Sequence, residues 1–336
     1  MDYSQRRLWG LVGILIGLVL LTFASIFIGS NSISAARVLE VLGNRDDSYE
    51  STVIFEQRIP RTLLVIVVGS ALGVAGALMQ ALTRNPLADP GILGVNAGAS
   101  LAVVIAVAAV GNTSIWFYMW FAFLGACLAS IAVYVLGSLG GATQGGGSPA
   151  RLALAGVAIS MAVSSIVQVV ILSNQNAYNE FRFWAAGSTE GRGYAVFFAV
   201  LGFIIAGIVI AIATAPGLNA IALGDDTGAA LGVKVQRLRI WVMIAVTLLA
   251  GAATAAVGPI MFIGLGVPYI ARGICGPNQR WVIPFSAAAA PLVMLVADLL
   301  ARVVIAPQEI QTGIVTAILG GPLFIYVIRR RKVEAV

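Results

Sequence analysis

Apolar runs of about 20 residues, bounded by glycine, proline, asparagine or charged residues, recur along the entire 336-residue sequence. A helix of that length crosses the hydrocarbon core of a bilayer. Hydrophobic residues make up 60% of the chain and charged residues 10%, whereas a soluble domain is about 45–50% apolar and about 25% charged. The sequence therefore predicts an all-α, polytopic membrane protein of about ten transmembrane helices, at residues 8–28, 62–82, 92–111, 116–136, 151–172, 194–213, 239–257, 259–274, 281–302 and 312–328.

The count and direction of these helices depend on the breaks between runs and on the loop charges. Between the seventh and eighth runs only Gly258-Pro259 interrupts the apolar sequence, and a proline at membrane depth is also compatible with a kink in one helix. With an even number of helices, the positive-inside rule places both termini in the cytoplasm. The basic residues on that side are then Arg6, Arg7, Arg84, Arg151, Lys234, Arg237, Arg239, Arg272, Arg280, Arg329, Arg330, Arg331 and Lys332.

The side-chain inventory excludes several kinds of chemistry. The sequence has no histidine, and its two cysteines, Cys127 and Cys275, are isolated, so we expect no metal site, no resident cofactor and no Cys/His catalysis. The polar segments are too short to hold an ATPase domain, so an energy source must come from other chains. The best intramembrane ionisable candidate is Asp298, one turn before Arg302 on the same helix face.

Two other classes of protein stay open as alternatives. An ion-coupled secondary transporter is also a bundle of about ten helices, but it normally needs carboxylates along its path, and these are scarce here. A membrane-embedded enzyme needs a nucleophile and base or a metal set, and neither is present. The pattern favours a transport protein driven by partner subunits over both alternatives.

A polar stripe follows one face of the predicted helix at 151–172. Ser160, Ser164 and Gln168 are spaced four residues apart, with Ser165 beside them. Polar side chains at membrane depth usually avoid lipid. Two readings remain open, hydrogen bonding to neighbouring helices and the lining of a hydrated path.

Residues 214–238 form the longest loop predicted between helices on the cytoplasmic side. Two short helical pieces are expected, Leu218–Gly224 and Asp225–Gly232, with Asp225 or Asp226 capping the second. Apolar residues in such a loop are typical of a surface that docks a partner protein, and an alternative is that the loop lies on the membrane surface.

Three segments rich in glycine or proline are predicted to have structural roles. Gly69, Gly73 and Gly76 predict close helix packing, since small residues let backbones approach in lipid. The turn at Arg84–Gly91 contains two prolines, and a rigid helix–helix turn is favoured over a functional role. Gly141–Gly147 lacks the Gly-Lys-Ser/Thr ending of a phosphate loop and is interpreted as a flexible linker.

Several motifs together resemble the FecCD family of ABC-importer permeases. The first signature consists of Arg58–Arg61, Gly73–Gln80 and Arg84–Gly94. Gly258–Leu265, with Pro268 and Arg272, is similar to the second signature of the family. Gly313–Ala317, with Gly320–Phe324, is similar to the third. This family includes the vitamin B12, haem and iron-siderophore systems. One departure is Tyr269 after Pro268, where the family commonly has histidine, so no role of that histidine is transferred.

The resemblance implies the type II ABC importer permease fold, with one permease domain over residues 1–336 and a coupling loop at about 214–238. It also implies four kinds of partner: a second permease in a homodimer or heterodimer, two cytoplasmic ATPase subunits that bind ATP, an extracytoplasmic binding protein, and the bacterial inner membrane around them. The implied translocation path includes Ser160, Ser164, Ser165 and Gln168. Contact with the ATPase is implied for Leu218, Ala222, Leu223, Gly224, Ala230, Leu231 and Gly232, and outward-facing docking of the binding protein for Arg58, Arg61 and Arg302.

The sequence Glu309–Gly313 is informative about the substrate. It is more similar to siderophore permeases, because B12 and haem relatives tend to have proline where this chain has Gln311. The resemblance therefore favours import of iron-siderophore complexes, with haem and vitamin B12 as alternatives.

Overall fold

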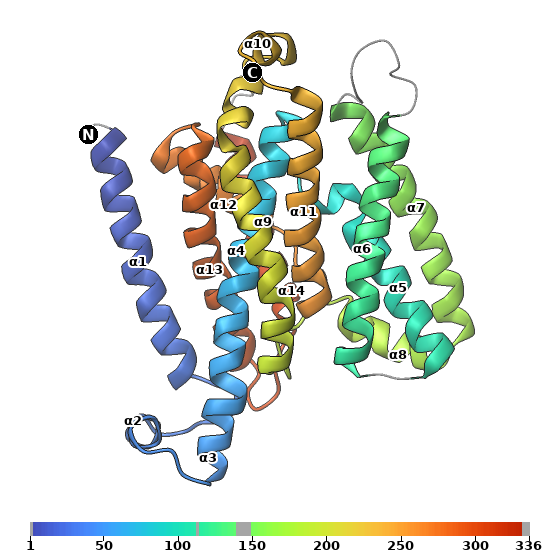
Figure 1. Ribbon diagram of the computed structural model, residues 1–336. Helices are drawn as coiled ribbons and strands as arrows, with labels where there is room; N and C mark the ends of the chain where they lie inside the picture. The colour runs from blue at the N-terminus through green and yellow to red at the C-terminus, as the bar shows by residue number, and fades with distance from the viewer. Residues whose placement is uncertain (1–2, 112–113, 139–148, 331–336) are drawn as a thin grey trace.

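The computed structural model describes residues 3–111, 114–138 and 149–330, and within them it is built from helices without strands (Figure 1). The Gly141–Gly147 linker and the basic residues Arg331 and Lys332 lie outside the described residues. The helical elements are α1 (Tyr3–Phe27), α2 (Ala35–Gly43), α3 (Tyr49–Thr52), η1 (Val53–Arg58), α4 (Ile59–Thr83), η2 (Pro90–Leu93), α5 (Val95–Val110), α6 (Ile115–Ser138), α7 (Pro149–Ser173), α8 (Gln175–Trp184), α9 (Tyr194–Ile221), α10 (Asp225–Ala230), α11 (Val235–Val257), α12 (Ile263–Cys275), α13 (Gln279–Val303) and α14 (Thr312–Arg330).

Each of the ten predicted transmembrane segments corresponds to one helix. Within the described ranges, seven helices are long and apolar enough to cross a membrane, and three shorter apolar helices are found at Val95–Val110, Ile263–Cys275 and Thr312–Pro322. The prediction of an all-α protein with about ten apolar helices is confirmed.

At Gly258-Pro259, where the sequence was also compatible with one kinked helix, the chain forms two separate helices, α11 and α12. Gly258 ends α11 with φ +77°, and Phe262 precedes α12 with φ +70°, so the backbone leaves the helical region at both positions. A Cβ at Gly258 would lie 2.3 Å from the carbonyl oxygen of Trp184, which only glycine tolerates. The break is therefore a packed connection that brings the end of α8 against the end of α11.

Helix α4 lies at the centre of the bundle, where α13, α11, α12 and α9 pack around it (Figure 1). The predicted role of its glycines in close packing is confirmed. A Cβ at Gly76 would lie 1.7 Å from the carbonyl oxygen of Gly264, and one at Gly73 would lie 2.6 Å from that of Ser286. These contacts place the α4 backbone directly against α12 and α13. Helices α5, α6 and α7 form a second group, which meets the first mainly through α11.

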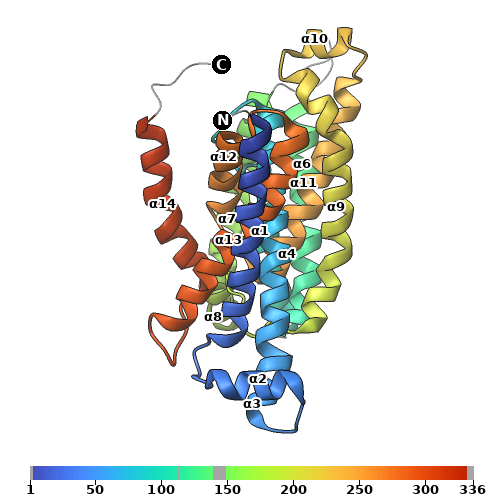
Figure 2. The ribbon, with the colours of Figure 1, turned by 90° about the vertical axis from the view of Figure 1, so that its left-hand side faces the viewer.

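The start of α1, the end of α14 and α10 lie at one end of the bundle, and α2, α3 and α8 lie at the other (Figures 1 and 2). We call these the α10 end and the α2 end. Helix α9 continues through Pro216 to Ile221, so the segment predicted as a loop at 214–238 begins as helix. Its first expected helical piece is the last turn of α9, whereas its second piece is confirmed as α10.

Candidate functional site

A buried carboxylate organises the α2 end of the bundle. Asp298 on α13 is fully buried, and its Oδ1 accepts hydrogen bonds from Arg61 Nε at 3.0 Å and Arg61 Nη2 at 2.9 Å. Thr189 Oγ1 donates to the same oxygen at 2.5 Å, and Arg302 Nη2 donates to Oδ2. Asp298 and Arg302, which the sequence places one turn apart on one helix face, thus form an ion pair. A buried charge is stable only when it is paired and hydrogen-bonded, and these donors come from α4, α13 and the loop after α8.

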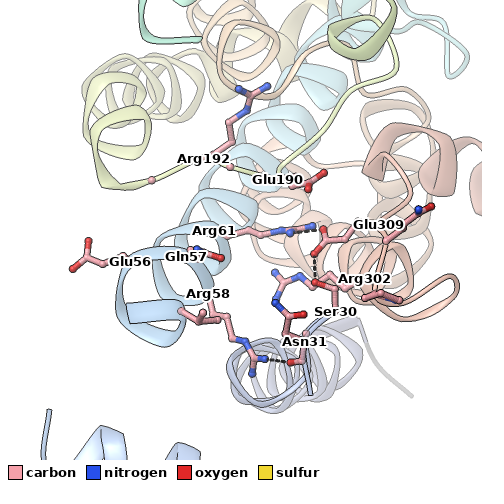
Figure 3. A pocket seen from close by; sticks show the side chains of 16 residues that line it. Ser30, Asn31, Glu56, Gln57, Arg58, Arg61, Glu190, Arg192, Arg302 and Glu309 are labelled. Carbon is pink, nitrogen blue, oxygen red and sulfur yellow. Dashed lines mark hydrogen bonds and ion pairs between the residues drawn. The ribbon is translucent and has the colours of Figure 1, made fainter. Parts of the chain in front are cut away.

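A second carboxylate joins the same network from the loop after α13. Glu309 Oε2 accepts a hydrogen bond from Arg61 Nη1 at 2.6 Å, and its Oε1 accepts one from Ser30 Oγ at 2.8 Å (Figure 3). Arg61 therefore bridges Asp298 and Glu309, and the loop after α13 is fixed to α4 and to the segment after α1.

Arg58 differs from the other two arginines in having main-chain partners. Its Nη1 donates to the carbonyl oxygens of Ile26 and Phe27, both at 2.9 Å, and its Nη2 donates to that of Asn31 at 2.6 Å. Among the described residues no carboxylate pairs with it. Asp298 and Glu309 thus form ion pairs with Arg61 and Arg302, whereas Arg58 is held by main-chain carbonyl oxygens.

These arginines line a polar hollow of about 560 Å³ at the α2 end (Figure 3). Glu56, Glu190 and Arg192 line it as well. The structure brings the three predicted docking arginines together, but Arg58, Arg61 and Arg302 are only 4%, 8% and 1% exposed. Each guanidinium is bonded inside the protein, so none of the three is an exposed cation, and their role in docking stays a prediction. Sequence reasoning missed Thr189 and the counter-charge role of Glu309, and the lone carboxylate Asp298 was the signal that could have led to them.

The α10 end carries an exposed apolar surface around the short helix α10. Leu223 and Leu231 are 70% and 64% exposed. Gly224 has φ +118°, which favours glycine and lets the chain turn between α9 and α10. Leu218 does not belong to this surface, because the extension of α9 buries it completely in the core. The other predicted coupling residues, Ala222, Ala230 and Gly232, are exposed.

Asp225 ties α10 to two transmembrane helices. Its Oδ2 accepts a hydrogen bond from Arg239 Nη2 at 2.5 Å, and its Oδ1 accepts one from Arg84, the C-cap residue of α4. The predicted side-chain cap by Asp225 or Asp226 is wrong, since Gly224 is the N-cap and Asp225 lies in the first turn. The turn at Arg84–Gly91 is therefore connected to α10 as well as joining α4 to α5.

The polar stripe on α7 is mostly exposed at the surface of the bundle. Ser164 and Gln168 are exposed and Ser160 is half-buried, at the edge of the helix face on which Val167 and Ile171 pack inward. Ser165 Oγ donates to the carbonyl oxygen of Met161 in the same helix. In the described part of the chain, the other three stripe side chains have no hydrogen-bond partner. Bonding to neighbouring helices of this chain is therefore not their role.

Comparison with known proteins agrees with the motifs in the sequence. The model of the FecCD transport family matches residues 17–330, nearly the whole chain. The chain belongs to the FecCD transport family. Tyr269 of this FecCD protein is half-buried on α12, six residues before that helix ends at Cys275.

Relatives of this FecCD chain match over almost their full lengths. The chain is 42% identical to the ferric enterobactin transport system permease protein FepD of Escherichia coli (strain K12), over 95% of this chain and 94% of that protein. It is 35% identical to the hemin transport system permease protein HmuU of Yersinia pestis, over 95% of each chain. A solved structure of a metal-chelate type ABC transporter in an inward-facing conformation aligns with a TM-score of 0.82 and 26% identity, over 96% of this chain and 99% of that one. The fold is therefore that of an ABC transporter permease.

Proposed function

We propose that the chain is the permease subunit of a binding-protein-dependent ABC importer that moves iron-siderophore complexes into the cytoplasm. The observation that carries this proposal is the 42% identity, over nearly the whole chain, to a ferric enterobactin permease. A haem importer is the second candidate, because a hemin permease is 35% identical over the same extent. The scarcity of carboxylates at membrane depth fits cargo that arrives already chelated, since a bare metal ion needs protein ligands to replace its water.

The partners of the proposed importer are a second permease, two ATPase subunits and a binding protein. The ATPases bind and hydrolyse ATP, and this chain carries no cofactor of its own. The apolar surface at Leu223 and Leu231 supports docking of an ATPase, because two exposed leucines next to a short helix fit an apolar cleft. Of the thirteen cations predicted on the cytoplasmic side, all except Arg331 and Lys332 fall within the described residues, and these eleven lie at the α10 end. Their position supports a cytoplasmic location of that end and of both termini.

The binding protein docks at the α2 end. Arg58 lines the hollow and forms no ion pair with a carboxylate of the described chain, which supports an acidic partner. Salt screens the attraction between a cationic site and an acidic partner, so this docking should weaken as salt is raised.

The translocation path runs along the polar stripe of α7. Ser164 and Gln168 are exposed at the surface of their own bundle, so a path lined by them is closed by a second permease with its own stripe opposite. An identical copy or a related chain serves this role equally well.

Uptake in a bacterial strain that lacks its own FecCD permeases tests the proposal. The chain is expressed together with candidate ATPase and binding-protein subunits, and cells are given ⁵⁵Fe-labelled catecholate, hydroxamate and citrate chelates, haem and cobalamin. We expect accumulation of at least one ferric siderophore, which Leu231→Glu abolishes and the apolar control Leu231→Met preserves. Accumulation of haem alone would replace the siderophore assignment, and accumulation of none would contradict the importer.

A further inference from the structure

An apolar groove runs between α6 and α11 on the outer surface of the bundle, where the two helices lie side by side (Figure 1). Its floor contains the buried side chains of Ser130 and Met243, and the exposed Ile131 and Ile244 form its walls. Both helices are long and apolar enough to span a membrane, so the groove faces the hydrocarbon region. None of the transport or docking residues discussed above lines it.

The size of the groove fits a segment of an alkyl chain. Its volume is about 310 Å³, and an apolar cavity of about 150 Å³ holds one benzene molecule, so there is room for roughly twelve carbon atoms. On α11 the lining extends from Ile240 to Leu248, which corresponds to roughly 12 Å along the helix axis. The shape is therefore elongated and runs parallel to the lipid chains of a bilayer.

Basic side chains stand at the end of this groove that lies nearest to α10. Arg237 precedes Ile240 by three residues and Ile244 by seven, so it shares their helix face. Arg237 and Lys234 are exposed, and in the described part of the chain neither side chain has an ion-pair partner. Arg239, on the opposite face, is buried and holds Asp225. The cations beside the groove are thus available to an external anion.

We propose that the α6–α11 groove binds an anionic phospholipid, with one acyl chain in the groove and the phosphate at Arg237 and Lys234. The apolar lining accounts for the acyl chain, and the two cations account for a preference for anionic headgroups. A basic residue near the membrane surface strengthens binding of anionic lipid about fivefold. A zwitterionic lipid fills the same groove but gains little from the cations. This inference depends on membrane insertion and not on which substrate is carried.

Photo-crosslinking tests this site in the transporter reconstituted into phosphatidylcholine nanodiscs. The probes are phosphatidylglycerol and phosphatidylcholine, each with a diazirine in one acyl chain, and labelled peptides are mapped by mass spectrometry. We expect labels to concentrate at Cys127 and Thr247, which line the groove, with phosphatidylglycerol in excess. Arg237→Gln should lower that excess about fivefold. Arg6→Gln, which removes the same charge at the same end on α1, should leave it unchanged.

A steric variant provides an independent measurement. Cys127→Phe places a ring in the groove and should remove most of the labelling at Thr247, whereas Leu128→Phe, at the adjacent exposed position, should not. Thr247→Phe fills the groove from α11 if the first variant folds poorly. Even labelling over all exposed faces of α6 and α11, an unchanged phosphatidylglycerol excess in Arg237→Gln, or crosslinks from the groove to a second permease would each overturn the proposal.

Discussion

Arg61 on α4 and Asp298 on α13 are 237 positions apart in the sequence, yet they form a buried ion pair with Arg61 Nη2 2.9 Å from Asp298 Oδ1. The pair joins the two helices that pack together most extensively. Thr312, at the start of α14, accepts or donates a 2.8 Å hydrogen bond with Thr189, which itself donates to Asp298. One carboxylate therefore connects α4, α13, α14 and the loop after α8.

Removal of the Asp298 charge should destabilise the protein strongly. Asp298→Asn leaves Arg61 and Arg302 buried with Glu309 as the remaining carboxylate, and breaking a buried pair costs about 3–5 kcal/mol. The double variant Asp298→Asn/Arg302→Gln should recover part of that loss, because Arg61 keeps Glu309. Thermal unfolding of the purified protein in detergent measures both. A single variant as stable as the wild type, or a double variant with fully additive loss, would contradict the network.

Loss of the Asp225 contacts should impair coupling more than stability. Asp225→Asn removes the charge that holds Arg84 and Arg239, and because Asp225 is 41% exposed its ion pairs stabilise the fold by less than about 1 kcal/mol. We expect a normally inserted protein in which less substrate is transported per ATP hydrolysed, since α10 loses its ties to α4 and α11. Uptake and ATP hydrolysis are measured in the reconstituted importer. Asp226→Asn is the control, and equal coupling in the two variants would refute the role of Asp225.

Labelling of single cysteines introduced on α7 should distinguish positions that line a water-filled path from positions that face lipid. In a background with Cys127→Ala and Cys275→Ala, single cysteines replace Ser164 or Gln168, and a control cysteine replaces the exposed apolar Val169. A charged methanethiosulfonate reagent should label the first two in at least one nucleotide state, because it reacts in water and not in hydrocarbon. Val169 should stay unlabelled. Equal protection at all three positions would mean that no hydrated path follows the stripe.

Asp89, in the turn between α4 and η2, should tolerate neutralisation. Burial raises the pKa of this carboxyl above its usual value, although the hydrogen bond from the Gly91 N–H to its Oδ1 acts in the opposite direction. A raised folded-state pKa means that the ionised form costs stability once the pH exceeds it. Asp89→Asn keeps an acceptor for Gly91 without the charge and should be at least as stable as the wild type at pH 7.

The difference in stability between the wild type and Asp89→Asn should shrink as the pH falls through the pKa of folded Asp89, because Asp89 of the wild type then also becomes neutral. Asp89→Ala removes the cap and should lose about 1 kcal/mol. Unfolding midpoints between pH 4 and 8 measure both effects. Greater stability of the wild type than of Asp89→Asn at pH 7 would contradict the raised pKa.

The apolar runs determined the helices by themselves. A run of 20 apolar residues has no stable place in water, and its backbone has no hydrogen-bond partner in lipid except within a helix, so length and composition suffice. The glycines of α4 predicted close packing for a similarly local reason, since a missing side chain matters wherever a neighbour approaches. The motifs at Arg58–Arg61 and Gly258–Leu265 likewise identified the family before any contact was known.

The tertiary structure decided which charged and apolar residues are accessible. Arg61 and Arg302 flank helices as exposed anchors would, and only the register of α4 against α13 places Asp298 and Glu309 within their reach. Leu218 and Leu223 both lie among small and apolar residues in the sequence. Because α9 continues through Pro216 to Ile221, Leu218 is buried in the core, whereas Leu223 lies beyond the helix and is exposed. Burial and ion pairing depend on contacts between residues far apart in the chain, and local periodicity carries no information about those contacts.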